Sequence, residues 1–395
     1  MANSLLTPQQ ITRRALVILH QKLNFVGNIN RQYDDRFAQD GAKIGDTLRI
    51  RLPNQYTVRT GAALSVQDTT ETNTTLQVNN QKGVDTQFTS VDLTLSLDDF
   101  AQRILDPAMS VLASNIEADA LTMRKNVWQS VNNIGSPFAL RQALLARKRL
   151  TDSLAPEDGN RSVVMNTQDN VDLVDAVKGL FQDSKEIAAQ YREGKVGRTG
   201  GFTYFENTLL SSDTTGTAAS TTGYLINGGS QTGATMTVDT GTTTFLVGDI
   251  ITITGVNEVH PETKADTGRL QQFVVTANSG TSATSLAISP AIVTSGGAQN
   301  VTAAPADNAP ISKIGGNATL YNASLAFHRD AFAFATADLV LPKGVDMASR
   351  AVMDGISMRL VRQYDIQNDR FPVRIDVLYG YKAIRPQLAC RILSN

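Results

Sequence analysis

A helical repeat of apolar residues is the first clear pattern in the chain, between residues 8 and 25. Apolar side chains at steps of three and four share one face of an α-helix. That face consists of Ile11, Ala15, Ile18 and Leu19. Arg13 and Arg14 lie off this face, so the pattern predicts an amphipathic helix with both arginines away from its buried side.

Strict alternation of polar and apolar residues follows Gly45. The run Asp46–Leu52 alternates and is stopped by Pro53, which predicts a half-buried strand. From 54 to 92 the chain is rich in Thr, Gln and Asn, with only short alternating runs such as Thr75–Val78. We expect a long, exposed, two-stranded excursion that is too polar to bury much surface alone.

The longest apolar stripe comes next. Ser96–Asp99 has the form of a capping box and predicts a short helix through Leu105. Asp106 then precedes Pro107, and an N-cap residue followed by proline predicts a second helix, ending at about Asn132. It would be roughly 39 Å long, a strut rather than an ordinary helix of about 11–12 residues. Its stripe consists of Leu105, Ala108, Leu112, Ile116, Ala120, Met123, Val127 and Val131.

Helices and a strand then alternate. Ser136 and Pro137 repeat the cap-and-proline device and predict a helix to about Leu150. Arg161–Met165 predicts a short buried strand, and Thr167 is expected to cap a third helix. The apolar face of that helix would contain Val171, Val174, Lys178 and Phe181. Such alternation is typical of α/β or α+β proteins.

Composition changes near residue 210. Between Ser211 and Leu320 only ten of 110 residues are charged, or about 9%, against 18% for the whole chain. Thr, Ser and Gly dominate, and short β-type runs alternate with turns. This pattern predicts an inserted all-β module, a small barrel or sandwich. Sequence of mixed type resumes at about Ala323, and Arg374–Tyr379 is its clearest strand.

The bulk composition restricts the class of protein. With 395 residues, two or three folding units are expected, and 41% hydrophobic residues suffice for a real core. Lys plus Arg number 36 against 37 for Asp plus Glu, so the net charge of −1 gives no drive toward nucleic acid or membrane. No secretory signal and no stretch of ~20 apolar residues is present, which predicts a soluble protein made in a cytoplasm.

Candidate chemistry is sparse. His20, His260 and His328 are isolated, and the single Cys390 is expected to be a small apolar residue in a terminal strand. The glycine cluster Gly194–Gly201 has the wrong lysine position for a phosphate-binding loop, so a turn is expected there. We therefore expect no catalytic, cofactor-binding or metal-binding residue, and no enzyme.

Other charged groups have ordinary interpretations. The pairs Asp34-Asp35 and Asp98-Asp99 are expected to be solvated at turns and caps. Arg141–Arg149 is a basic stretch that suits either a solvated helix face or contact with a polyanion.

Four groups of residues, in order and spacing, resemble one family. They are Tyr191–Phe202, Gly248–Val256 with Phe273–Val275, Ala326–Phe332, and Asp376–Gly380 with Arg385, Pro386 and Cys390–Ile392. Together they resemble the major capsid proteins of tailed bacteriophages with the Hong Kong ninety-seven (Johnson) fold, and in particular the P-twenty-two-type coat protein branch.

The resemblance implies an α+β fold with a long spine helix, an extended loop, axial and peripheral domains, and an inserted barrel-like domain. We expect an N-terminal arm and first strand (1–53), an extended β loop (54–92), and the spine helix with peripheral and axial elements (93–210). The inserted all-β domain would be 211–322. The remainder, 323–395, would return to the axial and peripheral domains.

The implied function is that of a coat subunit. Copies would assemble as pentamers and hexamers into an icosahedral shell around double-stranded DNA, in the host cytoplasm, with a scaffolding protein and later expansion. A portal protein, a cement protein, non-specific contact with DNA and no membrane complete the expected partners. Candidate assembly contacts are Arg13, Arg14, Glu258, Glu262, Lys264, Asp266 and Arg269.

One departure from the family pattern changes the expected contacts. The family member that the chain most resembles carries a long charged loop early in the insertion, whereas Gly228–Thr244 contains only Asp239 as a charge. Inter-capsomer salt bridges from that loop are therefore in doubt, and apolar contacts or a cement protein would replace them.

An alternative interpretation is a phage tail or surface module whose Thr/Gly-rich domain binds carbohydrate. The module contains few aromatic residues for stacking on sugars, with Tyr224, Phe245 and Phe273 before Asn300.

Overall fold

The computed structural model describes residues 7–33, 46–64, 66–67, 72–87, 101–177, 197–368 and 370–394. The chain forms two compact units. The first contains Met1–Arg51, Asn73–Thr122 and Phe332–Ile384, and the second contains Leu52–Thr72, Met123–Ala331 and Arg385–Asn395. Each unit is therefore built from segments that are distant in the sequence.

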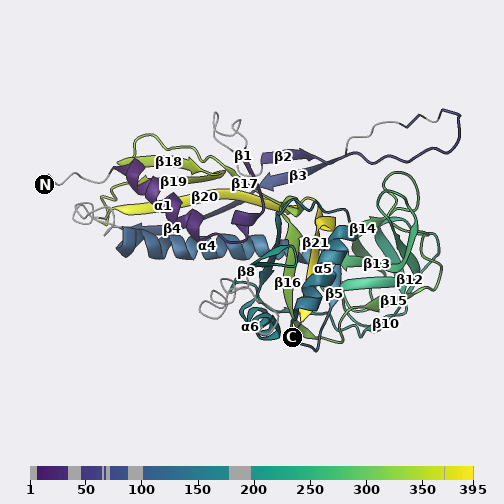
Figure 1. Cartoon of the computed structure of the whole chain (residues 1–395). Coiled ribbons are helices and arrows are strands. Elements are labelled where there is room, and N and C mark those ends of the chain that lie inside the picture. Colours follow the sequence, from purple (N-terminus) through teal and green to yellow (C-terminus); the bar gives the residue numbers. More distant parts are fainter. Residues whose placement is uncertain are drawn as a thin grey trace. The chain divides into compact units, whose positions relative to one another are not determined.

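The first unit combines two helices with an antiparallel-dominated sheet (Figure 1). Its elements are α1 (Pro8–Lys22), η1 (Val26–Asn28), β1 (Asn30–Tyr33), β2 (Asp46–Arg51), β3 (Asn73–Val78), β4 (Asn80–Gln87), η3 (Ala101–Leu105), α4 (Asp106–Leu121), β17 (Phe332–Ala337), β18 (Met347–Met353), β19 (Ile356–Arg362) and β20 (Pro372–Ala383). The sheet order is β1-β17-β20-β19-β18, and β4 also pairs with β20. The long strand β20 is thus the centre of this unit.

Helix α1 confirms the predicted amphipathic pattern. All four predicted apolar residues are buried, and Arg13 and Arg14 are exposed. The helix begins with a capping box that the sequence interpretation missed, in which Thr7 and Gln10 bond each other's backbone N–H. The buried face packs against α4 and β18.

The segment 54–92 differs from its prediction. Strand β3 pairs with β2, whereas β4 pairs with residues 372–379 of β20, so no separate two-stranded excursion spans this range. Leu76 and Val78 of β3 are buried against the alanines of β17. The prediction was wrong because alternating residues in a polar strand can still bury one face when the opposing strand carries small side chains.

The strut helix is also displaced from its prediction. Among the described residues, the π-helical turn η3 already precedes Pro107, and α4 ends at Leu121, followed by η4 (Thr122–Asn126). Asp106 is not the cap, because the residue before it, Leu105, is already helical. Proline lacks only a donor that the first turn does not need, so it marks a permitted position rather than an obligatory start. The predicted capping box at 96–99 lies outside the described residues.

The second unit contains a seven-stranded sheet, two helices and a barrel. Outside the barrel, its elements are β5 (Ser130–Asn132), α5 (Leu140–Asp152), β6 (Arg161–Met165), α6 (Thr167–Val177), β7 (Arg198–Thr199), β8 (Phe202–Glu206), β9 (Asp213–Thr214), β16 (Leu320–His328), η5 (Arg329–Ala331), η6 (Pro386–Leu388) and β21 (Ala389–Ser394). The sheet order is β5-β21-β16-β6-β8-β7, with β9 on β16. The predicted strand at 161–165 is confirmed, and every residue of it is buried.

Both helices of this unit correct details of the prediction. Helix α5 begins at Leu140 rather than at Pro137, without a side-chain cap. In α6 the side chain of Asn166, not Thr167, accepts the N–H of Asp169. Val171 is 62% exposed, and the buried residues of α6 are Asp169, Leu173 and Val177. The predicted face is therefore wrong at Val171, and two of its other members, Lys178 and Phe181, lie outside the described residues.

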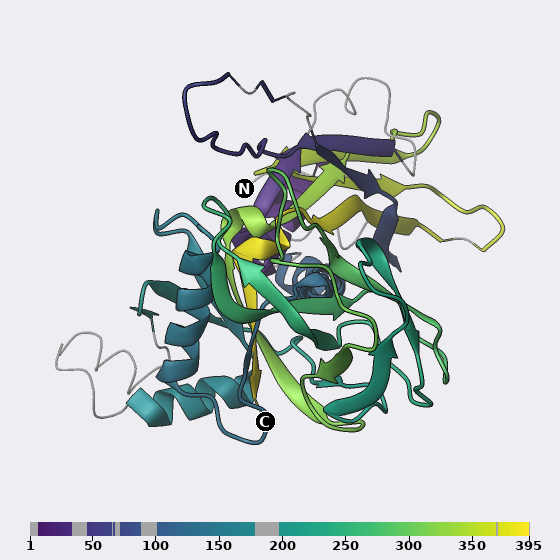
Figure 2. The ribbon, with the colours of Figure 1, turned by 90° about the vertical axis from the view of Figure 1, so that its right-hand side faces the viewer.

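The inserted all-β domain is a closed six-stranded barrel, as predicted. Its strands are β10 (Thr221–Ile226), β11 (Gly233–Asp239), β12 (Ile250–Val259), β13 (Asp266–Val275), β14 (Ser285–Ile292) and β15 (Pro310–Lys313). They close in the order β10-β11-β14-β13-β12-β15. In Figure 2 these strands, coloured in green, curve around a common interior. That interior is filled by buried apolar side chains, among them Tyr224, Phe245 and Phe273.

A buried carboxyl group lies under η1 in the first unit. Glu117 of α4 accepts the backbone N–H of Phe25 at 2.8 Å. Burial raises the pKa of Glu117 to about 7, against the opposing effect of the backbone N–H groups of Phe25, Asn24 and Val26. The folded protein therefore holds this proton more tightly than the unfolded chain does.

This shift predicts a pH-dependent stability. The contribution of protonated Glu117 to the free energy of unfolding is about 3 kcal/mol at most. It is fully present below about pH 4.5 and is lost as the pH rises through about 7. In Glu117→Gln the amide oxygen still accepts from Phe25, but nothing titrates, so the decline should disappear. Chemical denaturation of the monomer between pH 5 and 8 measures it. The control Glu262→Gln, at an exposed position, should keep the wild-type slope, and an unchanged slope in Glu117→Gln would contradict the assignment.

Candidate assembly surfaces

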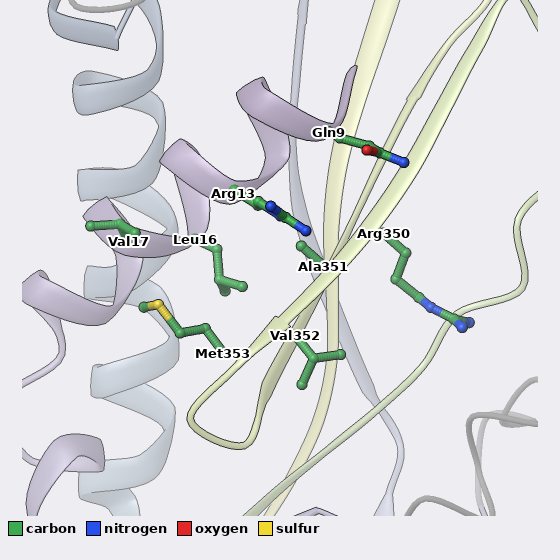
Figure 3. Close-up of a pocket in the computed structure, with 8 residues that line it drawn as sticks. All are labelled: Gln9, Arg13, Leu16, Val17, Arg350, Ala351, Val352 and Met353. Carbon is green, nitrogen blue, oxygen red and sulfur yellow. The ribbon is translucent and has the colours of Figure 1, made fainter. Parts of the chain in front are cut away.

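A hollow lined by α1 and β18 surrounds one of the predicted contact residues. It has a volume of about 500 Å³ and is lined by Gln9, Arg13, Leu16, Val17, Arg350, Ala351, Val352 and Met353. Figure 3 shows Arg13 on α1 beside the strand that carries Ala351 and Val352. Arg350 lies 3.4 Å from Asp338. The hollow thus joins apolar side chains with guanidinium groups, and Arg14 is not among its lining residues.

The charged residues of the barrel are used inside the second unit. Arg269 lies 2.6 Å from Asp152 of α5 and 3.2 Å from Glu258. Glu258 also lies 3.4 Å from Arg149 of α5. Two of the predicted contact residues, Glu258 and Arg269, therefore join β12 and β13 to α5.

Three further predicted contacts lie in and near the turn between β12 and β13. Lys264 donates from Nζ to the carbonyls of Pro261, Gly297 and Gln299. Asp266 accepts the backbone N–H of Gly268 at 2.7 Å, and this bond lowers its pKa. Glu262 is exposed. Of the five charged barrel residues predicted as contacts, Glu262 is the one whose side chain the structure leaves most available to another molecule.

The histidines and the cysteine have structural positions. His20 lies 2.8 Å from Asp354 at the end of α1, and His328 is buried 3.1 Å from Asp158. His260 accepts two backbone N–H groups in its turn. Cys390 lies in β21, as predicted, and burial raises the pKa of its thiol to about 12. Within the described ranges no group of His, Cys, Asp and Glu could hold a metal ion.

A buried set of charges, which the sequence interpretation missed, joins the barrel to the sheet of the second unit. Arg124 binds both oxygens of Asp213, at 3.1 and 2.9 Å. Arg391 donates to the carbonyl of Gly248, and Lys313 donates to those of Gly216 and Gly316. Asp249 accepts the N–H groups of Gly216 and Leu246. We call Arg124, Asp213, Asp249, Lys313 and Arg391 the polar junction.

Burial perturbs the ionisation of the polar junction. It raises the pKa of Asp249, against the N–H of Leu246 and the charge of Lys313, and it lowers the pKa of Lys313. A sequence signal for this set exists. Asp213 and Lys313 are two of the few charges between Ser211 and Leu320, and they lie near its two ends.

The 52–72 loop carries several exposed apolar side chains close together in the sequence. Val58 is 94% exposed, and Tyr56, Leu64 and Val66 are also exposed. Clusters of exposed apolar residues are typical of interaction surfaces. No helix of the described segments is long and apolar enough to cross a membrane.

These features describe two units held together by internal ion pairs and buried charges, with exposed apolar side chains on the 52–72 loop. The model of one family, P22 coat protein (gene protein 5), matches residues 38–392. The chain belongs to this family, as the sequence motifs predicted. It is a bacteriophage coat protein, which forms the shell of the virion from many copies of itself.

Solved structures with similarity to the chain include other phage capsids. A chain from Mycobacterium phage Che8 is 14% identical over 94% of this chain and 90% of that chain, with a TM-score of 0.47. The mature capsid of bacteriophage PhiM1 is 11% identical over 94% and 87%, with a TM-score of 0.44. The CUS-3 coat protein I-domain is 32% identical over 23% of this chain and 94% of that chain, with a TM-score of 0.19. No curated protein matches the chain.

The predicted class of fold is confirmed. The protein is α+β with a closed barrel, and it belongs to the coat protein branch for which the motifs predicted a Hong Kong ninety-seven-type capsid fold. The family match, rather than any single solved structure, carries this assignment.

The polar junction predicts an unusual sensitivity at Lys313. Lys313→Met leaves the carbonyl groups of Gly216 and Gly316 without their donor and Asp249 without a nearby positive charge, so the free energy of unfolding should fall by about 1–3 kcal/mol. The control Lys343→Met makes the same change at an exposed position and should change it by less than about 0.5 kcal/mol. Denaturant unfolding of both variants is the measurement, and equal stabilities would show that the junction is not stabilising.

Proposed function

We propose that this coat protein assembles as pentamers and hexamers into an icosahedral shell that encloses the phage double-stranded DNA. Assembly takes place in the host cytoplasm around a scaffolding protein, includes a portal protein, and is followed by expansion of the shell. The protein acts through contacts and is not an enzyme.

The observation that carries this proposal is the exposed apolar content of the 52–72 loop in a member of a coat protein family. Side chains such as Val58 and Leu64 gain about 25 cal/mol for each Å² of apolar surface that a neighbour covers. A shell supplies such a neighbour to every copy. Assembly from many weak, repeated contacts also permits the correction of errors.

The hollow between α1 and β18 supports a scaffold contact. Arg13 and Arg350 supply positive charge beside the apolar Val17, Val352 and Met353. An amphipathic helix with acidic residues on one side matches this combination. The proposed occupant is therefore an acidic helical segment of the scaffolding protein, with Arg13 as the principal contact.

Contact with packaged DNA is expected to be weak. Arg141 and Lys148 are exposed on α5, whereas Arg149 is paired with Glu258. A net charge of −1 gives little counterion release, and a wall that bound DNA tightly would oppose its packaging.

Carbohydrate binding by the barrel, the alternative function, has little support. Tyr224, Phe245 and Phe273 are fully buried in the barrel interior, and Tyr321 is 5% exposed. Stacking on sugars needs exposed rings, and the described barrel residues offer none. The proposed partners include a cement protein that fits over the Gly228–Thr244 segment, in which Asp239 is the only charged residue.

The proposal predicts closed particles. The chain expressed with its scaffolding protein should form shells of uniform diameter that electron microscopy can resolve into pentamers and hexamers. Expressed alone, it should give irregular assemblies. A compact monomer at all concentrations, seen by size-exclusion chromatography under both conditions, would refute the proposed function.

A charge reversal tests the scaffold contact. Arg13→Glu should reduce scaffold-dependent shell yield about tenfold or more, because an acidic partner would now be repelled at a contact worth about 1–2 kcal/mol. Its unfolding midpoint should stay near that of the wild type, because Arg13 is exposed. The control is Lys343→Glu, the same reversal at an exposed loop position of the same unit. Equal shell yields from the two variants would remove α1 from the scaffold surface.

A further inference from the structure

The base of the 52–72 loop rests on the barrel at Gly297. A Cβ at Gly297 would lie 2.4 Å from the carbonyl oxygen of Gln55 and 3.3 Å from the N of Tyr56. Real Cβ atoms essentially never approach another atom within 3.0 Å, so no side chain fits here. The φ angle of Gly297 lies outside the left-handed region. Contact with Gln55, rather than backbone conformation, therefore requires glycine at this position.

Lys264 fixes the segment that carries Gly297. Its Nζ donates to the carbonyls of Pro261 and Gly297 at 2.6 Å each, and to that of Gln299 at 3.3 Å. An ammonium group has three donors, so these bonds satisfy it. They tie the β12–β13 turn to the β14–β15 connection. The backbone that touches Gln55 is thereby fastened to the rigid barrel.

Hydrogen bonds connect the two sides of the loop beyond Gln55. Gln67 accepts the N–H of Thr57 at 2.8 Å and donates to the carbonyl of Thr57 at 2.5 Å. The exposed side chains of Tyr56, Val58 and Leu64 lie on this braced segment. A fixed direction at Gln55 therefore sets the direction in which these apolar side chains are presented.

We propose that Gly297 is a seat, or fixed contact point, for the 52–72 loop and that the hydrogen bonds of Lys264 hold this seat in place, so that the barrel orients the apolar side chains of the loop toward a second copy of the chain. The second half of this statement rests on the proposed function. Holding the loop before contact removes part of the loss of conformational entropy that would otherwise oppose binding. Lys264 and Gly297 are positioning residues in this scheme.

The chain offers a matched pair of substitutions. Gly297→Ala places a methyl group against Gln55, whereas Gly280→Ala, also in the barrel and outside the left-handed region, places one in open space. Lys264→Met removes the three bonds to the carbonyls and keeps the length of the side chain. Trypsin cleavage after Arg59, located by mass spectrometry on the full-length soluble chain, reports release of the loop without any need for assembly.

The expected result is cleavage after Arg59 about tenfold faster in Gly297→Ala and Lys264→Met than in the wild type and Gly280→Ala. Cleavage after Arg269 should be equal in wild type, Gly297→Ala and Gly280→Ala. Shell yield should fall in Gly297→Ala relative to Gly280→Ala.

Three results would overturn the inference. Equal cleavage after Arg59 in Gly297→Ala and Gly280→Ala would refute the seat. In Gly297→Ala, an acceleration of cleavage after Arg269 equal to that after Arg59 would also refute it, because the barrel itself would then have unfolded. Faster release of the loop with unchanged shell yield would refute its role in contact between copies. If wild-type protein formed no shell, the proposed function would fail. The rate of cleavage after Arg59 would still show whether Gly297 holds the loop.

Discussion

The second unit depends on one constraint, which is that the barrel enters and leaves the sheet at adjacent points. Strand β9 leads into the barrel and β16 leads out of it, and the two pair through Asp213 with Tyr321 and Thr214 with Leu320. Two short strands alone would allow the barrel to turn about them. The polar junction removes that freedom, because its bonds link β21, the segment after β9, the start of β12 and the end of β15.

Burial of these charges is expensive, and the cost explains their geometry. A buried ion is tolerated when hydrogen bonds satisfy its remaining donors or acceptors. Lys313 and Asp249 meet on the same residue, Gly216, whose carbonyl accepts from one and whose N–H donates to the other. Gly216 also lacks room for a Cβ, which would lie 2.3 Å from the carbonyl of Thr244. Apolar packing could hold the barrel as firmly, but hydrogen bonds allow fewer alternative orientations.

Local patterns in the sequence predicted the elements whose buried residues recur regularly within one continuous segment. Helix α1, strand β6 and the barrel were found because periodicity and turns are properties of the segment itself. The starts of α4 and α5 were misplaced because proline marks where a helix is permitted to begin, not where it must. Strand β4 was missed because its place is decided by pairing with β20, almost 300 residues away.

The surroundings of the candidate contact residues were harder to predict, because they depend on residues distant in the sequence. Exposure of Arg13 follows from helical period, whereas the pairing of Arg269 with Asp152 depends on tertiary structure that spacing does not encode. The same applies to Gly297, which no local turn pattern distinguishes from the glycine before it.

The use of charge inside the second unit limits how copies of the chain can meet. Asp213, Asp249 and Lys313 are buried in the polar junction, and Glu258 and Arg269 are paired with α5. Lys264 is occupied by backbone carbonyls. Recognition between barrels therefore has few charges to draw on, and in the proposed assembly the apolar side chains of the 52–72 loop supply more of the contact energy. Apolar contact is weakly directional, so its specificity depends on how accurately the loop is held. In the proposed assembly, directional bonds within each copy thus perform the task that charge complementarity would perform if the contact loops were charged.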